Sequence, residues 1–542
     1  MRWWGWGEDH DASPLSARAQ ELVGAMLGVE PSAPPAERGG PESVALPAPA
    51  LDAPARTALD KAVGAEHVLD DHAARLRCAA GRSYPDLVRL RSGALDHAPD
   101  AVVRPADEAQ VAAVLAACAQ SGVAVVPFGG GTSVVGGVDA VRGAHHAAIA
   151  LDLTRMDRVL DLDPKSLTAR VEPGLMGPEL ERRLGNAGLT LGHYPQSFEY
   201  STVGGWVATR SAGQASTGVG RIDELVQAVR CQTPAGVLDT RDVPASAAGP
   251  SLRELVVGSE GVLGVITAAT LHVRDAPRAR RYEAWSVGTF AQGAEAMRRL
   301  EQAGAHPDVC RLSDEAETQL TAAMGSSGGR AERLGRAYLR LRGQEEGCLL
   351  IAGFEGSDDD VIRRRGRFAE MLRAAGGVFL GERWGQAWRH GRFAAPYLRD
   401  ELMDRGVMVD TLETACSWSA LGATHDAVGA AIGQALADRG TPGLVMCHVS
   451  HLYSSGASLY FTFIAPQERG AELDQWRAAK TAAGDAIEAA GATITHHHAV
   501  GRDHAPWMPT EVGPLGLEAL RALKTRLDPQ AIMNPGKLLP DA

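Results

Sequence analysis

The sequence predicts an α+β protein of two main domains, preceded by a helical extension. Three observations support this fold class. A chain of 542 residues exceeds what one hydrophobic core usually organises. Between residues 96 and 276, short β-branched runs alternate with helical patterns and glycine clusters. From residue 277 onward, long arginine-rich helical patterns alternate with fewer strands, which indicates a second α+β domain.

Residues 1–95 form the predicted N-terminal extension. It begins with a short helix near 15–27 and continues through a connector rich in Pro and Ala over 29–56. A helical stretch then returns over 57–80.

The next region, 96–276, has recognisable helix and strand boundaries. Residues 105–122 predict a helix, because Pro and Asp stand at its start and Gly at its end. A second, amphipathic helix is predicted over 176–188. Strands are predicted at 123–128, 147–153, 158–174 (a pair joined by an Asp-Pro turn), 189–195 and 264–274.

The second domain has two clear helical patterns, "RAERLGRAYLRLRG" and "DVIRRRGRFAEMLRAAGG". Its clearest strands are "GCLLIAGFEG" and "SLYFTFIAP". The tail "LEALRALKTRLDPQAIMNPGKLLP" predicts one helix followed by a turn and an extended end.

Composition excludes several function classes. The net charge of −12 argues against a nucleic-acid surface, and 45% apolar with 22% charged residues is ordinary for a soluble globular protein. Seven scattered cysteines without a C-x-x-C pair indicate neither a disulfide framework nor a thiolate zinc site. No apolar run is long enough to cross a bilayer, and the N-terminus lacks a signal-peptide core, so a cytoplasmic protein is expected. The 49 Arg against 5 Lys indicate the codon bias of a GC-rich bacterial genome.

The stretch "PFGGGTSVVGG" (127–137) contains three adjacent glycines after an apolar run. Bare backbone N–H groups in such a turn can form a nest that binds phosphate, although a plain tight loop explains the pattern equally well. The loop lacks the lysine of a P-loop, and Val134 stands where a Rossmann fingerprint needs its third glycine.

Two further glycine clusters follow, "SFEYSTVGGWVATRSAG" (197–213) and "GSEGVLGVIT" (258–267). In this order the three clusters resemble the FAD-binding domain of the vanillyl-alcohol oxidase/PCMH flavoprotein superfamily. The resemblance implies a PCMH-type FAD-binding domain over 96–276, a substrate (cap) domain over 277–500 and a C-terminal segment, 501–542, that returns to the FAD site. It implies FAD bound by backbone nests, without a covalent bond, because the glycine loop ends in Thr-Ser where flavin-attaching relatives carry His or Cys.

A narrower resemblance lies in "PYLRDELMDRGVMVDTLETACSW" (396–418), "CHVSHLYSSGASLYFTF" (447–463) and "THHHAVGRDHAPW" (495–507). These segments are similar to those of alkyldihydroxyacetone-phosphate synthases, as are "WWGWG" and "GHYPQSFEYSTVGGWVATR". The family implies an FAD enzyme that exchanges the acyl group of acyl-dihydroxyacetone phosphate for a fatty alcohol through a flavin N5 adduct. The alternative is an FAD-dependent 2-hydroxyacid oxidase or dehydrogenase; a flavin-binding scaffold without catalysis is disfavoured.

The resemblance also implies the cofactor-binding residues. They are Pro127, Phe128, Gly129, Gly130, Gly131, Thr132 and Ser133 in the first loop; Gln196, Ser197, Ser201, Thr202, Gly205, Thr209, Arg210, Ser211 and Ala212 in the second; and Glu260, Gly261, Gly264 and Ile266 in the third.

Substrate chemistry is assigned by the same resemblance to Arg399, Tyr460 and the triplet His496, His497, His498. Arg399 would clamp a phosphate or carboxylate, although an average arginine in "YLRD" forms a surface ion pair with Asp. Tyr460 would remove a proton next to a carbonyl, which requires nearby positive charge, from Arg399 or a protonated histidine, to lower its pKa.

The triplet is interpreted as one or two proton carriers facing the flavin, and no metal is predicted, because adjacent residues of an extended segment point to opposite faces. His193 and Arg311 match family positions near the site, Arg311 as a substrate ligand. His448 departs from the eukaryotic enzymes, which carry Arg there.

The expected partners are small molecules: a lipid or hydroxyacid with a phosphate or carboxylate. Peripheral membrane contact for lipid access and a homodimer are expected, and no nucleic acid.

Overall fold

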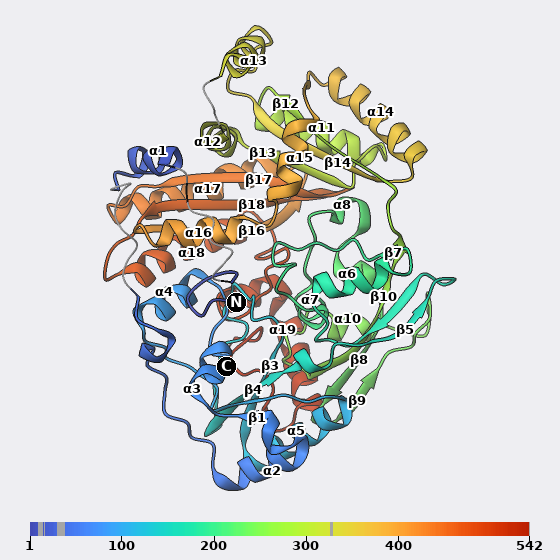
Figure 1. Cartoon of the computed structure of the whole chain (residues 1–542), viewed down its shortest axis with the longest axis vertical. Coiled ribbons are helices and arrows are strands. Elements are labelled where there is room, and N and C mark those ends of the chain that lie inside the picture. The colour runs from blue at the N-terminus through green and yellow to red at the C-terminus, as the bar shows by residue number, and fades with distance from the viewer. Residues whose placement is uncertain (9–14, 16, 30–37, 326–328, 541–542) are drawn as a thin grey trace.

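The computed structural model describes residues 1–8, 15, 17–29, 38–325 and 329–540. Two sheet-containing halves lie one above the other in Figure 1: the three smaller sheets of the first half lie below, and one large sheet with its helices lies above. None of the described helices is both long and apolar enough to cross a membrane.

A small sheet forms the base of the first half, with strand order β1-β2-β4-β3. Strands β2, β4 and β3 are parallel, and β1 is antiparallel to β2. The predicted helix at 105–122 is confirmed as α5: the Asp107 side chain caps its first turn, and Gly122 ends it in the left-handed conformation. The elements are β1 (Val68–Leu69), β2 (Ala101–Val103), β3 (Val123–Phe128), β4 (Ala147–Asp152), α2 (Ala53–Val63), α3 (His72–Arg77), α4 (Tyr84–Ser92), α5 (Glu108–Ser121) and the 3₁₀ turn η4 (Leu153–Arg155).

The second sheet is antiparallel, with order β5-β6-β10-β8-β9. Asp163 pairs with Thr168 across the predicted Asp-Pro turn, which confirms the strand pair. The elements are β5 (Val159–Asp163), β6 (Thr168–Val171), α6 (Gly177–Gly185), β7 (Leu189–Thr190), α7 (Val203–Thr209), α8 (Ser216–Val219), α9 (Ile222–Leu225), β8 (Val226–Thr233), β9 (Gly236–Asp239), α10 (Arg253–Val256), β10 (Val265–His272) and β11 (Arg274–Asp275), which pairs only with β7.

The large sheet has seven antiparallel strands in the order β15-β12-β14-β13-β17-β18-β16. Helices α11, α14, α17 and α18 contribute to the core on one face, and residues of the other face line a cavity. The elements are β12 (Ala279–Val287), α11 (Phe290–Gln302), β13 (Val309–Ser313), α12 (Glu315–Gly325), α13 (Arg330–Leu341), β14 (Cys348–Gly356), α14 (Asp358–Ala374), β15 (Val378–Gly381), α15 (Glu382–Gly391), α16 (Ala395–Met403), β16 (Val407–Ser417), α17 (Leu421–Asp438), β17 (Leu444–Tyr453), β18 (Gly456–Pro466) and α18 (Glu472–Ala489).

Strict alternation decides which residues of β18 meet the first half. Leu459, Phe461 and Phe463 are buried in the core with the helices. Tyr460, Thr462 and Ile464 therefore point to the opposite face, where they line a cavity.

Each terminal segment contacts the half of the molecule that lies far from it in the sequence. Near the N-terminus, α1 (Ala17–Leu27) packs on the large sheet, and the Trp6 N–H donates to Asp400 Oδ2 at 2.5 Å. Near the C-terminus, η5 (Ala505–Trp507) and α19 (Met508–Leu527) lead into a segment that pairs with β3: Val125 N–H donates to the Ile532 carbonyl at 2.8 Å, and Asn534 N–H to the Val125 carbonyl at 2.9 Å.

Two predicted elements are wrong in extent. The continuous helix expected over 57–80 ends at Gly64, whose φ of +90° no helix accommodates; the turns η2 (Pro41–Ser43) and η3 (Ala65–His67) flank α2. The strand expected over 189–195 stops after Thr190, because the N–H groups of Leu191 and Gly192 donate to the Glu181 carboxylate instead of a neighbouring strand. Part of the connector over 29–56, residues 30–37, lies outside the described residues.

Candidate active site

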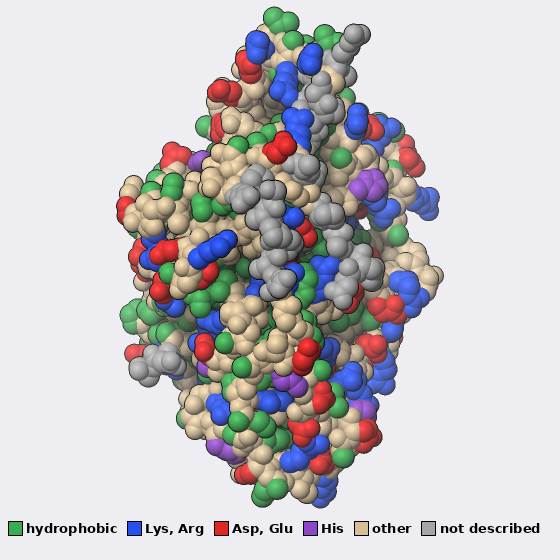
Figure 2. Space-filling model, turned by 60° about the vertical axis from the view of Figure 1, so that its left-hand side comes forward, with side chains coloured by type: hydrophobic (Ala, Val, Ile, Leu, Met, Phe, Trp, Pro, Cys, Tyr) green, Lys and Arg blue, Asp and Glu red, His purple; other side chains and the backbone are tan. Residues whose placement is uncertain are grey.

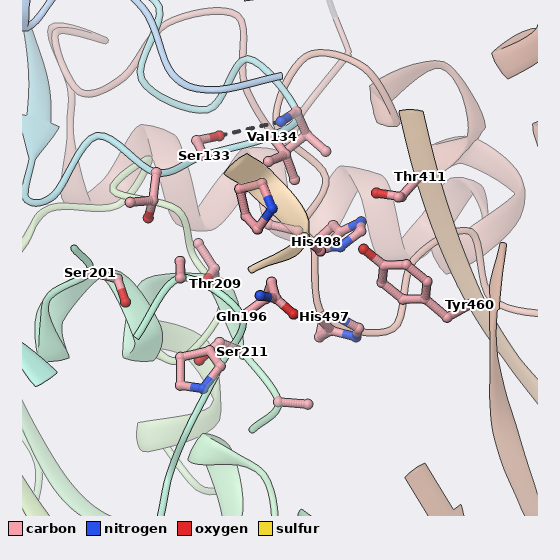
Figure 3. Close-up of a pocket in the computed structure, with 18 of the residues that line it drawn as sticks. Ser133, Val134, Gln196, Ser201, Thr209, Ser211, Thr411, Tyr460, His497 and His498 are labelled. Atoms are coloured by element: carbon pink, nitrogen blue, oxygen red, sulfur yellow. Dashed lines mark hydrogen bonds between the residues drawn. The ribbon is translucent and has the colours of Figure 1, made fainter. Parts of the chain in front are cut away.

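A cavity of about 530 Å³ lies between the glycine loops and the free face of the large sheet. Figure 3 shows its two walls: Ser201, Thr209 and Ser211 on one side, and Tyr460 with Thr411 on the other. His497 and His498 enter from a third segment, between these walls. Residues far apart in the sequence therefore meet around one space.

The glycine loop after β3 explains why three side chains are missing. A Cβ on Gly130 would lie 1.8 Å from the Tyr200 carbonyl oxygen, and a Cβ on Gly129 would lie 2.3 Å from Thr202 Oγ1. Gly131 has φ +68°. Glycine is therefore required at these positions even without a ligand, because the second glycine cluster packs directly against the first.

Nearly all of the predicted cofactor residues line the cavity. They are Pro127, Phe128, Gly129, Gly130, Gly131, Thr132, Ser133, Gln196, Ser197, Ser201, Thr202, Gly205, Thr209, Ser211, Ala212, Glu260, Gly261, Gly264 and Ile266. Sequence reasoning missed other residues that line the cavity, among them Pro173 after β6 and, in or beside the predicted loops, Val134, Val135, Gly137, Gly204 and Gln214.

Arg210 is the exception and does not line the cavity. It follows α7 in the left-handed conformation (φ +51°), and its guanidinium forms ion pairs with Glu254 at 2.9 Å and Asp223 at 3.3 Å. Arg210 therefore braces the loop from behind, and its assignment to the cofactor is corrected.

His193 is also displaced from its expected place. It is fully buried outside the cavity wall, and its Nε2 lies 2.8 Å from Ser211 Oγ, which does line the cavity. Burial lowers the pKa of His193 to about 3, so the ring is neutral. His193 therefore positions Ser211, which lines the cavity, and does not line the cavity itself.

Glu260 fixes the cavity wall to the C-terminal part of the chain. Its carboxylate accepts from the N–H groups of Val500 (2.8 Å) and Gly501 (2.7 Å), and its carbonyl accepts from Asn534 Nδ2 at 2.6 Å. Glu260 has a positive φ of 52°, and burial raises its pKa to about 7 despite these bonds.

Tyr460 stands at the centre of the opposite wall. Its ring stacks on His448 with centroids 4.8 Å apart, and His497 and His498 lie at 6.0 Å and 5.5 Å. Burial raises the pKa of Tyr460 to about 12, and a bond to Thr411 opposes this only in part. The expectation that Arg399 or an imidazolium lowers this pKa is therefore wrong; the cation that acts on Tyr460 is Arg311, and its effect is smaller than that of burial.

One buried carboxylate organises the histidine triplet. Glu413, 1% exposed, accepts from the backbone N–H groups of His497 (2.9 Å) and His498 (2.7 Å) and from that of His496 at 2.5 Å. Burial would raise the pKa of Glu413, but the three imidazoles and these N–H groups hold it well below its usual range. Three successive N–H groups on one acceptor bend the backbone, so the triplet is not the extended segment assumed from the sequence.

Two of the three histidine rings face the cavity. His497 and His498 line it, whereas His496 does not and instead bonds Tyr453. Burial lowers the pKa of both cavity histidines, although Glu413 opposes the shift. They are neutral imidazoles at pH 7 and can accept a proton.

Two arginines supply positive charge to the cavity. The Arg399 Nη1 group donates to the Arg82 carbonyl at 2.7 Å, and its Nη2 lies 3.3 Å from Asp400 Oδ1, while the side chain still lines the cavity. Arg311 Nη2 pairs with Glu317 at 2.6 Å. Glu317 also lies 3.2 Å from Nδ1 of His448, so His448 extends this charged network to the ring of Tyr460.

Beyond this polar end the cavity continues into an apolar arm. Helices α1 and α12 and the ends of strands β16, β17 and β18 enclose it. The arm is lined by Leu15, Val23, Leu320, Met324, Leu398, Leu402, Val409, Met446 and Ile464. Part of this lining follows from strand alternation, because Ile464 follows Tyr460 and Thr462 at the alternating positions of β18.

The glycine-loop side of the cavity fits a dinucleotide. It offers backbone at Gly129–Gly131, hydroxyl groups from seven Ser and Thr side chains, and the start of α7 with the Thr202 side chain at its N-cap. Two side-chain amide atoms that face no protein partner, Gln196 Nε2 and Gln214 Oε1, are buried in this wall. Such orphaned groups are expected where a polar ligand completes the hydrogen bonding.

Two family models match the chain: "FAD binding domain" over residues 99–240 and "FAD linked oxidases, C-terminal domain" over residues 276–538. The alkyldihydroxyacetonephosphate synthase of Dictyostelium discoideum is 34% identical over 482 residues, 88% of this chain and 79% of that protein. The enzyme of the same name from Trypanosoma brucei brucei is 33% identical over 503 residues, 91% of this chain and 82% of that protein.

Solved structures agree with the sequence comparison. An alkyldihydroxyacetonephosphate synthase superposes with a TM-score of 0.85 at 30% identity, covering 99% of both chains. A p-cresol methylhydroxylase superposes with a TM-score of 0.64 at 15% identity, covering 90% of this chain and 96% of that chain, which shows the shared fold alone. The α+β, PCMH-type fold and the FAD-binding domain predicted from the three glycine clusters are thereby confirmed. This chain belongs to the alkyldihydroxyacetonephosphate synthase family of FAD-dependent enzymes.

Proposed function

We propose that this enzyme replaces the acyl group of acyl-dihydroxyacetone phosphate with a fatty alcohol. One observation carries the proposal: a single cavity joins the FAD side, a polar end and an apolar arm. The polar end has two arginines, four histidine rings and the ring of Tyr460. A lipid phosphate needs all three parts. The similarity of 33–34% to two synthases supports the same substrate class.

Each part of the cavity binds one part of the substrate. Arg399 and Arg311 face the polar end and attract the phosphate, which arginine can bind with two parallel hydrogen bonds. The apolar arm buries the chain, and each buried CH₂ contributes about 0.8 kcal/mol. The reacting carbon then lies between the flavin side and Tyr460.

Proton transfer falls to Tyr460 and the neutral histidines. Because burial raises the pKa of Tyr460 to about 12, the phenol keeps its proton at neutral pH until a base accepts it. His498, whose ring is 5.5 Å from that of Tyr460, and His497 are neutral and suited to this. The phenol oxygen takes a proton from the substrate carbon as its own proton moves to imidazole. The phenol therefore stays neutral, the imidazole becomes an imidazolium, and the electron pair of the broken C–H bond stays with the substrate, next to its carbonyl group.

FAD, when bound, would supply an electron-rich ring nitrogen to the substrate carbon. The residues around it would hold it: Gln196 and Gln214 offer unpaired amide atoms, and the glycine loops offer backbone. We propose that FAD is held without a covalent bond.

The hydroxyacid oxidase considered from the sequence is set aside. A small hydroxyacid would fill the polar end and leave the apolar arm without a ligand. The test is to incubate the purified holoenzyme with acyl-dihydroxyacetone phosphate and hexadecanol and to measure the ether product by mass spectrometry. A parallel assay supplies 2-hydroxyacids with an artificial electron acceptor. Reduction of that acceptor without any ether product would overturn the proposal.

We also propose a peripheral membrane contact through α13. Leu334, Tyr338 and Leu341 recur at helical spacing and are 72%, 48% and 86% exposed. Arg333 and Arg340 flank them, and blue and green side chains lie together at this upper end of the molecule (Figure 2). Such a helix suits an anionic membrane surface. Sedimentation with phosphatidylglycerol vesicles should fall in a Leu334→Glu, Leu341→Glu variant, whereas binding equal to that of the parent would refute the assignment.

A homodimer and a bacterial, cytoplasmic location stay predictions. Light scattering of the purified holoenzyme measures the first, and fractionation of the source cells measures the second.

A further inference from the structure

A chain of ring-to-ring hydrogen bonds leads away from the cavity. His497, which lines the cavity, has its Nδ1 atom 3.0 Å from Nδ1 of His496. The other nitrogen of His496, Nε2, lies 2.5 Å from the hydroxyl of Tyr453. Both ring nitrogens of His496 are therefore used, one toward the cavity and one away from it.

The outer end of this chain lies at the surface. Tyr453 is the last residue of β17, partly exposed, and the exposed Ser454 and Ser455 follow it in the hairpin turn. His496, by contrast, is only 6% exposed. Arg221 stands beside the hydroxyl end of Tyr453; burial raises the pKa of Tyr453, and Arg221 opposes the rise. The three rings thus lead from the cavity to a partly exposed residue.

We propose that Tyr453, His496 and His497 form a proton relay between the cavity and solvent. A neutral imidazole carries a proton on one nitrogen and accepts one on the other, so it passes a proton by exchanging tautomers. His497 accepts a proton from the cavity on Nε2 and donates its Nδ1 proton to Nδ1 of His496. His496 donates from Nε2 to the Tyr453 oxygen, and the Tyr453 hydroxyl releases its own proton to water. One proton leaves the cavity, and every group of the relay ends neutral.

The surroundings hold the relay in place. His451 stacks on His496 with ring centroids 4.9 Å apart, and its own Nδ1 bonds Ser216 of the FAD-binding half. The Arg221 guanidinium donates to the carbonyl of His496 at 3.4 Å. Burial lowers the pKa of His496 to about 3, which keeps the central ring uncharged. A fixed, neutral central ring is what repeated transfer requires.

The relay rests on the proposed function, which removes a proton from a substrate carbon inside the cavity. Exchange of that proton with solvent is faster when a chain of hydrogen-bonded groups connects the two, and the relay supplies such a chain. Tyr453→Phe keeps the ring and removes the outermost hydroxyl. We expect the exchange of the substrate C1 hydrogen in deuterated water to slow by about 10²-fold, the lower end for positioned proton transfer.

Two further readouts distinguish a relay from a merely structural tyrosine. The solvent isotope effect on exchange should rise in Tyr453→Phe, and small imidazole buffers should restore part of the rate. Tyr84→Phe is the matched control: it is a buried tyrosine that loses one hydrogen bond, to Gln467 at 3.1 Å, and it contacts no relay residue. Its exchange rate should equal that of the parent.

The second variant is His496→Ala, which removes the central ring; its lost exchange should return with added imidazole. Exchange at the parental rate in Tyr453→Phe, with an unchanged isotope effect, would overturn the relay. Absence of exchange and of ether product in the parent would instead overturn the proposed function. Substrate-free protein with ¹⁵N-histidine then still decides the relay by NMR: solvent exchange of the His497 ring N–H should be slower in Tyr453→Phe, and equal rates refute it.

Discussion

Glu413 and Tyr460 are paired directly across strands β16 and β18. The Glu413 carboxylate is 1% exposed and accepts hydrogen bonds from the backbone N–H groups of the histidine triplet. The Tyr460 ring lies against the histidine rings of that segment. Residues directly opposite each other on one face of an antiparallel strand pair lie about 4.5–5.5 Å apart. The strand pair therefore fixes Tyr460 next to Glu413, and Glu413 in turn fixes the histidines that accept the proton.

The first prediction tests this arrangement with Glu413→Gln. The amide offers one acceptor and one donor in place of two acceptors, so at least one of the three N–H groups loses its partner. The anion also raises the pKa of His497 and His498; without it their pKa falls further, and the acidic limb of the pH–rate profile should move to lower pH.

Turnover of Glu413→Gln should fall while FAD content stays near that of the parent. Glu283→Gln is the matched control, because Glu283 is fully buried on the same sheet and bonds Trp285 and Arg365 away from the cavity. An unshifted pH profile in Glu413→Gln would contradict its electrostatic role.

The second prediction concerns Tyr460→Phe. The ring packing on His448 remains and only the ionisable oxygen is lost, so folding and FAD binding should persist. Turnover should fall by about 10²–10⁴-fold, the usual contribution of positioned proton transfer. Exchange of the substrate C1 hydrogen in deuterated water should be lost as well. Retained turnover, with loss on changing His497 or His498, would move the base to the histidines.

The third prediction is that Arg399→Lys weakens substrate binding and leaves the flavin in place. A planar donor becomes a point charge that cannot bond a phosphate with two parallel N–H groups. We expect KM to rise by at least 10-fold, as about 1.4 kcal/mol of lost binding implies. Loss of FAD absorbance from the purified variant would show instead that Arg399 is a cofactor or structural residue.

The fourth prediction uses the glycine loop. Gly130→Ala places a Cβ 1.8 Å from the backbone carbonyl of Tyr200, and backbone cannot move aside as a flexible side chain can. The two glycine clusters should separate, and the purified protein should lose most of its yellow colour. Gly433→Ala is the control: Gly433 lies in α17 with no atom near the added Cβ, and Ala there should stabilise the helix by about 1 kcal/mol. Full FAD content in Gly130→Ala would refute the packing argument.

The fifth prediction is that acid precipitation releases FAD into the supernatant. The cavity wall next to the glycine loop ends in Thr132 and Ser133, neither of which bonds a flavin ring. The yellow flavin absorbance should leave the washed pellet, as expected for a flavin that is bound without a covalent bond. Colour that stays in the pellet would demonstrate a covalent bond.

Interactions between near neighbours in the chain allowed the sequence to determine helix ends and strand faces. Asp107 and Gly122 mark the ends of α5, and alternation in 458–466 places Tyr460 and Thr462 on one face of β18, because capping and the two-residue period act between near neighbours. The FAD side of the cavity was predicted from the resemblance of the three glycine clusters to a flavoprotein superfamily, since the residues alone allowed a plain tight loop equally well.

Only the tertiary structure decided the electrostatics and the partners across long distances. Glu413 reaches the His496–His498 backbone from 83–85 residues away, and this pairing bends a segment that looked extended. Arg210 turns to Asp223 and Glu254, although its neighbours Thr209 and Ser211 line the cavity. Burial, which no local pattern reports, raises the pKa of Tyr460 instead of lowering it. A charge responds to everything packed around it, so its behaviour is settled only when the chain is folded.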